Sequence, residues 1–198
     1  MSFTDAKHLD IEKVPVIDIS KLCDNTDPLP VAKALHKAST GLGFIYIKGH
    51  GIPKDIINSL RKEGLTFFRN NEKNKDEVKI TEKHRGWLGY GGAKMEDNAK
   101  ADLKESFLWG YQDKNGASLN NHPLRGNNIW PSFQPNLEKT SMEYFNYADE
   151  LARNLMRGFA LGLDLEKNFF LKTCENPLSR ASLVYYPNQS PEHGKNQF

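Results

Sequence analysis

The chain has 198 residues, of which 38% are hydrophobic and 26% charged, a composition typical of a soluble globular protein with a sizeable core. Its 27 basic and 25 acidic residues leave a net charge of +2, which gives no argument for nucleic acid or an anionic membrane as partner. No segment approaches the roughly 18 apolar residues that span a bilayer, and residues 1–13 lack the apolar run of a secretory signal. Cys23 and Cys174 have no paired spacing, which favours free thiols, and we expect a cytoplasmic protein.

The first half of the chain predicts two short strands followed by two helices. The first strand covers residues 14–19, and a helix over 31–40 precedes the second strand at 44–47, which is apolar enough to be buried on both faces. A helix over 54–69 is followed by a charged helix at 72–79. Because Lys, Glu and Asp are mixed throughout 71–85, we expect this stretch to be solvated.

The second half predicts one long helix and two further strands. The stretch 86–94 is too rich in glycine for a regular element, whereas 104–110 reads as a strand with Phe107 and Trp109 on one face. A helix over 137–161 carries an apolar stripe at three- and four-residue spacing, and a shorter helix at 167–173 precedes a strand at 181–186. The order is mixed α/β, of the α+β type, with too few strands for a jelly roll of about eight.

Six short blocks along the chain resemble, in order, the landmarks of the isopenicillin-N-synthase-like iron(II)/2-oxoglutarate-dependent oxygenases. They lie at residues 14–19, 43–53, 85–90, 102–107, 128–131 and 183–187. The resemblance implies a double-stranded β-helix, a jelly-roll variant, with an α/β region packed on it. It assigns residues 1–125 to the N-terminal region and residues 126–198 to the long helix and first strand of a catalytic domain whose barrel is incomplete in this chain.

The resemblance also implies which cofactors belong to the full-length parent. Family members bind iron(II) through two histidines and one carboxylate, and an Arg-x-Ser motif holds 2-oxoglutarate. The iron-binding His-x-Asp follows the strand equivalent to 181–186, and no such motif appears between that strand and Phe198. We therefore expect no catalytic residue, no metal ligand and no bound cofactor in this chain alone.

Several literal matches to these motifs stand at the wrong place in the sequence. The His-x-Asp at residues 8–10 lies in a polar leader, and His50 belongs to a glycine-rich turn. The Arg-x-Ser at residues 180–182 precedes the closing strand instead of following it, so Arg180 reads as a strand-entry residue. His193 lacks an acidic residue two positions later, and no combination gives a facial triad in the family's order.

Four residues are candidates for lining an active site in a completed protein. Tyr186 matches the family tyrosine that hydrogen-bonds 2-oxoglutarate, although Val184 replaces the asparagine often found two positions earlier. Arg85 matches a position that contacts a substrate carboxylate in some members, and a guanidinium suits that role through its bidentate fork. Glu105 is expected to pair with Arg85 and orient it, and Tyr90 is a candidate wall of the substrate pocket. Each has a purely structural alternative. Tyr186 is then an ordinary strand aromatic, Arg85 a member of a surface ion pair, and Tyr90 part of the core packing.

Three functions remain open at this stage. The first is an oxygenase that couples 2-oxoglutarate decarboxylation to oxidation of a small molecule, present here as an inactive N-terminal part. The second is a stand-alone binding module derived from such an enzyme. The third is an oxidase that does not use 2-oxoglutarate, of the isopenicillin N synthase or ethylene-forming type. The expected partner is a small-molecule substrate, with neither nucleic acid nor membrane, and the substrate's identity and the oligomeric state are left open.

Overall fold

The computed structural model describes residues 14–92, 102–112 and 122–188, which form two compact units. The first unit comprises Met1–Gly51 with Tyr147–Glu175, and the second comprises Ile52–Asn146 with Asn176–Phe198. Helix α5, Pro135–Gly162, contributes residues to both units. The expected boundary at residue 125 falls inside the second unit and remains a prediction. Within the described ranges, no helix is long and apolar enough to cross a membrane.

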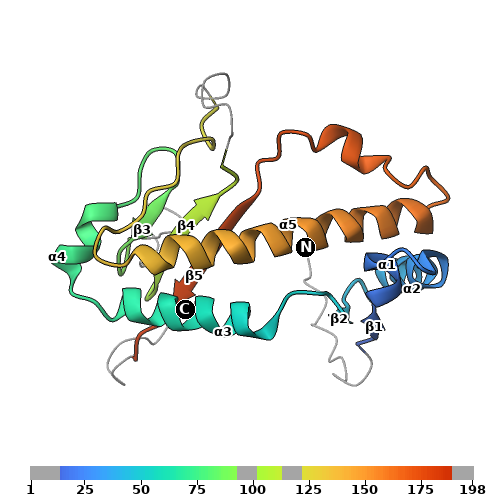
Figure 1. The fold of residues 1–198 in the computed structure, drawn as a ribbon, viewed down its shortest axis with the longest axis horizontal. Helices are drawn as coiled ribbons and strands as arrows, with labels where there is room; N and C mark the ends of the chain where they lie inside the picture. Colours follow the sequence, from blue (N-terminus) through green and yellow to red (C-terminus); the bar gives the residue numbers. More distant parts are fainter. Residues whose placement is uncertain (1–13, 93–101, 113–121, 189–198) are drawn as a thin grey trace, which may run out of the picture. The chain divides into compact units, whose positions relative to one another are not determined.

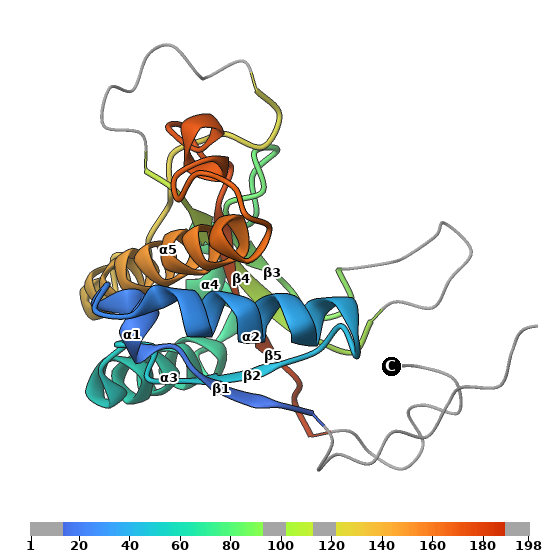
Figure 2. The same ribbon diagram turned by 90° about the vertical axis from the view of Figure 1, so that its right-hand side faces the viewer.

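The first unit is built on a two-stranded parallel sheet. Strand β1, Val16–Asp18, pairs with β2, Tyr46–Lys48, and helices α1, Ser20–Cys23, and α2, Pro28–Thr40, follow β1. Figure 2 shows β1 and β2 running side by side along α2. The core of this unit gathers apolar side chains from the sheet, α1, α2 and the later part of α5: Ile17, Ile19, Leu22, Val31, Leu35, Leu151, Leu155 and Phe159.

The prediction that the second strand is buried on both faces is wrong. Phe44 is 69% exposed and Tyr46 54% exposed, whereas Ile45 and Ile47 pack against the core. The reason is the alternation of side chains along a strand, which sends every second residue away from α1 and α2. A continuous apolar run therefore does not distinguish a strand covered on both faces from one covered on a single face.

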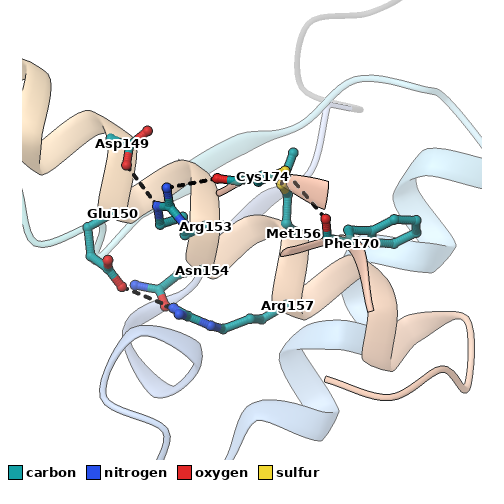
Figure 3. Close-up of polar contacts among 8 residues, drawn as sticks. All are labelled: Asp149, Glu150, Arg153, Asn154, Met156, Arg157, Phe170 and Cys174. Carbon is teal, nitrogen blue, oxygen red and sulfur yellow. Dashed lines mark hydrogen bonds and ion pairs between the residues drawn. The ribbon is translucent and has the colours of Figure 1, made fainter. Parts of the chain in front are cut away.

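Polar contacts along α5 hold the segment that follows it in the first unit (Figure 3). Arg153 donates from Nε to Asp149 Oδ2 at 2.8 Å and from Nη2 to the carbonyl of Cys174 at 3.3 Å. The Cys174 thiol lies 3.4 Å from the carbonyl oxygen of Phe170. These contacts pack a 3-10 turn, η3 at Phe170–Thr173, which stands where a short helix was expected.

The second unit contains a three-stranded antiparallel sheet in the order β3-β4-β5. Its strands are β3, Gly86–Leu88, β4, Glu105–Gly110, and β5, Arg180–Tyr185. Helix α3, Lys54–Phe68, precedes the sheet, and α4, Glu72–Lys75, leads through the 3-10 turn η2, Asp76–Val78, into β3. The expectation that 86–94 forms no regular element is wrong for its first three residues. These form β3, in which Trp87 pairs with Phe107.

One face of this sheet packs against α3 and the first part of α5, as Figure 1 shows. Phe107 and Trp109 are buried on this face, which confirms the sequence prediction for the strand at 104–110. Their neighbours on β5, one residue in two, are Ala181, Leu183 and Tyr185, and the helices contribute Phe67, Phe68, Leu137 and Phe145. The register of β4 with β5 thus directs one set of side chains into a closed core.

A buried ion pair lies at the edge of this core. Lys75 Nζ is 2.6 Å from Glu105 Oε2, and the two side chains are 3% and 9% exposed. The indole Nε1 of Trp87 donates to the same carboxylate oxygen at 2.7 Å, and Lys75 also donates to the carbonyl of Phe68 at 3.2 Å. The ammonium lies 4.8 Å from the centre of the Trp87 ring. One carboxylate therefore joins α4, β3 and β4.

We predict that Lys75→Met destabilises the second unit by about 3–5 kcal/mol, because it leaves the Glu105 carboxylate buried without a counter-charge. The double variant Lys75→Met with Glu105→Leu should recover most of this loss, since no buried charge remains. Urea unfolding followed by tryptophan fluorescence measures both, because all three tryptophans lie in the second unit. The control is Lys104→Met, whose partner Asp102 is 23% exposed. A Lys75→Met loss no larger than that of the control contradicts the prediction.

Candidate functional site

The second face of the three-stranded sheet, opposite the helices, carries the candidate site. Side-chain alternation places Leu88, Ser106, Leu108, Ser182 and Val184 on this face, which we call the open face. Val184 is 48% exposed and Ser182 is also exposed. The open face thus presents β5 to solvent, in contrast to the closed core on the helix side.

Tyr186 stands at one end of the open face. It follows β5 directly, two positions after Val184, and it is 61% exposed. Lys104 lies close enough to interact electrostatically with the phenol, and a hydrogen bond to the Asp102 carboxylate at 2.6 Å is the main reason that the pKa of Lys104 is raised. Tyr186 therefore projects from the end of β5 at which β4 begins.

Arg85 is presented by a tight turn between two left-handed residues. His84 has φ 55° and Gly86 has φ 105°, so the backbone on both sides of Arg85 is in a region that side chains disfavour. A Cβ at Gly86 would lie 2.4 Å from the carbonyl oxygen of Val78, which only glycine avoids. Thr81 closes the turn by donating its N–H to the carbonyl of Arg85 at 2.8 Å. Such strained turns persist where the surrounding contacts fix them.

The Arg85 side chain is a buried cation without a counter-charge among the described residues. The residue is 2% exposed, and Nη1 donates to the carbonyls of Lys83 at 3.3 Å and His84 at 3.2 Å. Within the described part of the chain, Nε has no hydrogen-bond partner and no carboxylate pairs with the guanidinium. Burial, and secondarily the charge of Arg180, lowers the pKa of Arg85.

The register of β4 with β5 brings Arg180 to the same place. Gly110 pairs with Arg180, and a Cβ built on Gly110 would lie 2.7 Å from Arg85 Nη2. Because side chains at paired positions share a face, Arg180 projects on the side of Gly110 that Arg85 Nη2 occupies. Asn128 fixes the Gly110 backbone through two hydrogen bonds of 2.9 Å, one to its N–H and one to its carbonyl.

Glu105 does not orient Arg85, so that expectation is wrong. Its carboxylate is held by Lys75 and Trp87 on the helix side of the sheet. It also lies five residues along β4 from Gly110, a separation of about 17 Å at ~3.4 Å per residue. Tyr90, 44% exposed, follows β3 near the start of β4. The structure therefore separates Arg85 from Glu105, Tyr90 and Tyr186.

Sequence reasoning missed the burial of Lys75 and the closeness of Arg180 to Arg85. The stretch 71–85 was expected to be solvated, yet Lys75 and Arg85 are among the most buried charged residues in the described ranges. No local signal marks these two, because their burial depends on Glu105, Gly110 and β5, which are distant in sequence. Arg180 does begin β5, which confirms its prediction as a strand-entry residue.

The described residues do not fit an iron centre. Among them, no three His, Cys, Asp or Glu side chains lie together so as to hold a metal ion. The literal motif residues His8, Asp10 and His193 lie outside the described ranges. Tyr186 offers a phenol that can donate a hydrogen bond to a carboxylate.

Comparison with protein families identifies the class. Residues 14–133 match the model described as the non-haem dioxygenase in morphine synthesis N-terminal family. The chain therefore belongs to the non-haem iron(II)/2-oxoglutarate-dependent oxygenase family, as the six sequence blocks predicted. It is 30% identical to the homoarginine-6-hydroxylase 2-ODD-C23 of Glycine max, over 94% of this chain and 60% of that protein.

Other relatives agree on the fold and on the extent of the match. The crystal structure of a full-length Neurospora crassa protein in complex with alpha-KG is 30% identical, with a TM-score of 0.70 over 88% of this chain and 54% of that one. A putative 2OG-Fe(II) oxygenase of Caulobacter crescentus, at 21% identity, shares the fold with a TM-score of 0.78, and the match covers 88% and 56% of the two chains. A 1-aminocyclopropane-1-carboxylate oxidase of Dictyostelium discoideum is 28% identical over 91% of this chain and 50% of that protein. The chain thus spans about half to three fifths of these relatives, and the mixed α/β fold class is confirmed.

We predict that Gly86→Ala destabilises the second unit by about 3 kcal/mol, because alanine is strained at this φ and its Cβ meets the Val78 carbonyl. Urea unfolding followed by tryptophan fluorescence measures the loss. The control is Ser182→Ala on the open face, which should change the free energy of unfolding by less than about 0.5 kcal/mol. A Gly86→Ala variant as stable as the control would show that the turn presenting Arg85 is not fixed as described.

Proposed function

We propose that this chain forms the N-terminal part of an iron(II)/2-oxoglutarate-dependent oxygenase that oxidises a small molecule, with the open face as one wall of its active site. The observation that carries the proposal is Arg85, a buried guanidinium without a carboxylate partner in the described ranges at one end of that face. Family membership supports the reaction class. In the whole enzyme, iron(II) and 2-oxoglutarate would activate dioxygen, which is the oxidant.

Arg85 is suited to holding a carboxylate of the substrate. Two carbonyls already occupy Nη1 and fix the guanidinium plane, so the remaining donors are pre-organised for a ligand. A charge-assisted hydrogen bond in a buried setting is roughly twice as strong as a neutral one. The low exposure that makes the unpaired cation unfavourable therefore also strengthens its attraction for a substrate anion.

Tyr186 is suited to a different ligand at the opposite end of β5. Six residues separate it from Arg180, which corresponds to about 20 Å along the strand at ~3.4 Å per residue. We assign to its hydroxyl the role of donating a hydrogen bond to 2-oxoglutarate. This separation leaves the middle of the open face, at Ser182 and Val184, for the space between co-substrate and substrate anion. Glu105 and Tyr90 take no part in this assignment.

A second candidate is an oxidase that does not consume 2-oxoglutarate. The similarity to a 1-aminocyclopropane-1-carboxylate oxidase favours keeping it, because that relative matches nearly as much of this chain as the hydroxylases do. The replacement of the family asparagine by Val184 is a further reason. The two candidates differ in one product, since only the first forms succinate.

We predict that purified residues 1–198 form no succinate when supplied with iron(II), 2-oxoglutarate and ascorbate, because the described part of the chain brings no set of metal ligands together. Succinate release, measured by coupled assay or chromatography, tests this. A relative of full length assayed in parallel, the Glycine max hydroxylase, is the positive control. Succinate above the no-enzyme blank would contradict the assignment of this chain as a part of the enzyme that lacks the iron site.

In a completed protein, Arg85→Ala and Tyr186→Phe should give opposite kinetic signatures. Loss of a hydrogen bond to a charged group, about 1.5–3 kcal/mol, raises the substrate KM roughly 10- to 150-fold in Arg85→Ala. Tyr186→Phe should instead raise the KM for 2-oxoglutarate and leave that for the substrate unchanged. Steady-state kinetics with each substrate varied in turn measures both, with Arg69→Ala, at the exposed residue that follows α3, as control. Unchanged KM values in both variants would remove these residues from the site.

A further inference from the structure

Two arginines meet at the Gly110 end of the open face without a carboxylate between them in the described ranges. Arg85 comes from the turn before β3, and Arg180 begins β5. They approach closely enough for the charge of Arg180 to act on the Arg85 guanidinium. Like charges repel, and a buried cation with no counter-ion is unfavourable by itself. An anion bound between the two would offset this cost.

The free donors of Arg85 point to where such an anion binds. Nη1 is engaged with two backbone carbonyls, whereas Nε and Nη2 have no hydrogen bond to the described residues. These two nitrogens form one edge of the guanidinium, which matches two oxygens of a carboxylate or phosphate. Because Gly110 has no Cβ, Nη2 can lie against its backbone, on the side where Arg180 projects.

We propose that Arg85 and Arg180 together bind an oxyanion, with the Arg85 Nε–Nη2 edge as the bidentate fork and Arg180 as the second cation. The inference rests on the proposed function in one respect, namely that the oxyanion is the carboxylate or phosphate group of the substrate. Arg180 thereby becomes a ligand-binding residue in addition to the first residue of β5. The exposed position of Arg180 lets it close over the anion from the solvent side.

Arg180 also determines which substrates the site selects. A monoanion that pairs with Arg85 alone leaves the second positive charge uncompensated, whereas an oxyanion that reaches both arginines satisfies both. The site therefore favours substrates with a terminal carboxylate or phosphate over neutral analogues of the same size, because a neutral group leaves a buried cation unpaired. At this end of the sheet, the positive charge of the two arginines thus selects anionic substrates over neutral ones.

The experiment measures anion binding to residues 1–198 without any turnover. Sodium acetate and sodium phosphate are titrated at pH 7 against sodium chloride at matched ionic strength, since chloride screens charge without offering a fork. The readouts are the Tm and the NMR signal of the arginine Nε–H groups. We expect a saturable rise in Tm and a shift of one Nε–H signal, absent in Arg85→Lys, which keeps the charge but loses the fork.

Arg180→Gln is the decisive variant, because Arg180 is exposed and its replacement should not disturb folding. It should weaken anion binding about tenfold or more and leave the anion-free Tm unchanged or higher. Arg69→Gln, an exposed arginine on the surface of the same unit, should bind as the unaltered chain does. A response to acetate alone supports a carboxylate, and one to phosphate alone supports a phosphate group.

Two results would overturn the proposal. One is a Tm that depends on acetate or phosphate no differently from chloride. The other is equal weakening by Arg180→Gln and Arg69→Gln, which would reduce the effect to net charge. Either result leaves the oxygenase assignment standing, because succinate formation by a completed protein is a separate observation. Failure of turnover in a completed protein would conversely leave the anion site intact.

Discussion

The second unit depends on the Glu105 carboxylate and the two donors that share its oxygen. Lys75 from α4 and Trp87 from β3 both bind Oε2, while Lys75 also reaches the last carbonyl of α3. The apolar face of β4 is thereby closed against the helices at the end where β4 begins. With that face closed, the alternation of the strands leaves Ser182 and Val184 on the other face. The candidate site therefore lies on the face of the sheet opposite the one that the ion pair helps to close.

The contrast between Lys75 and Arg85 separates structure from function in this unit. Both are buried cations on the same stretch of charged sequence, and Lys75 has a carboxylate at 2.6 Å. Arg85 is held by backbone carbonyls within a strained turn, and among the described residues it is influenced by the charge of Arg180 and has no carboxylate partner. Backbone strain that presents an uncompensated charge is typical of a place where a ligand supplies the opposite charge.

Sequence periodicity predicted the elements whose apolar residues recur at regular spacing, such as the strand at 104–110 and the long helix. It could not predict β3, because three residues beginning with glycine become a strand only through pairing with Phe107. It also predicted a solvated Lys75, because lysine is usually exposed, whereas the side chain is buried. Resemblance pointed to Arg85, but the role of Arg180 depends on the β4–β5 register, a non-local property. Site residues that come together through strand pairing are in general beyond local patterns.

Reading the native coding sequence beyond the codon for Phe198 tests most directly whether this open sheet belongs to an iron oxygenase. The chain spans about half to three fifths of its relatives, and the open face lacks a covering layer at Val184 among the described residues. We predict a His-x-Asp within roughly a dozen codons, with a distal histidine and an Arg-x-Ser beyond, which together supply the ligands of the facial triad and of 2-oxoglutarate. A stop codon directly after Phe198 would contradict this account and favour a binding module without iron chemistry.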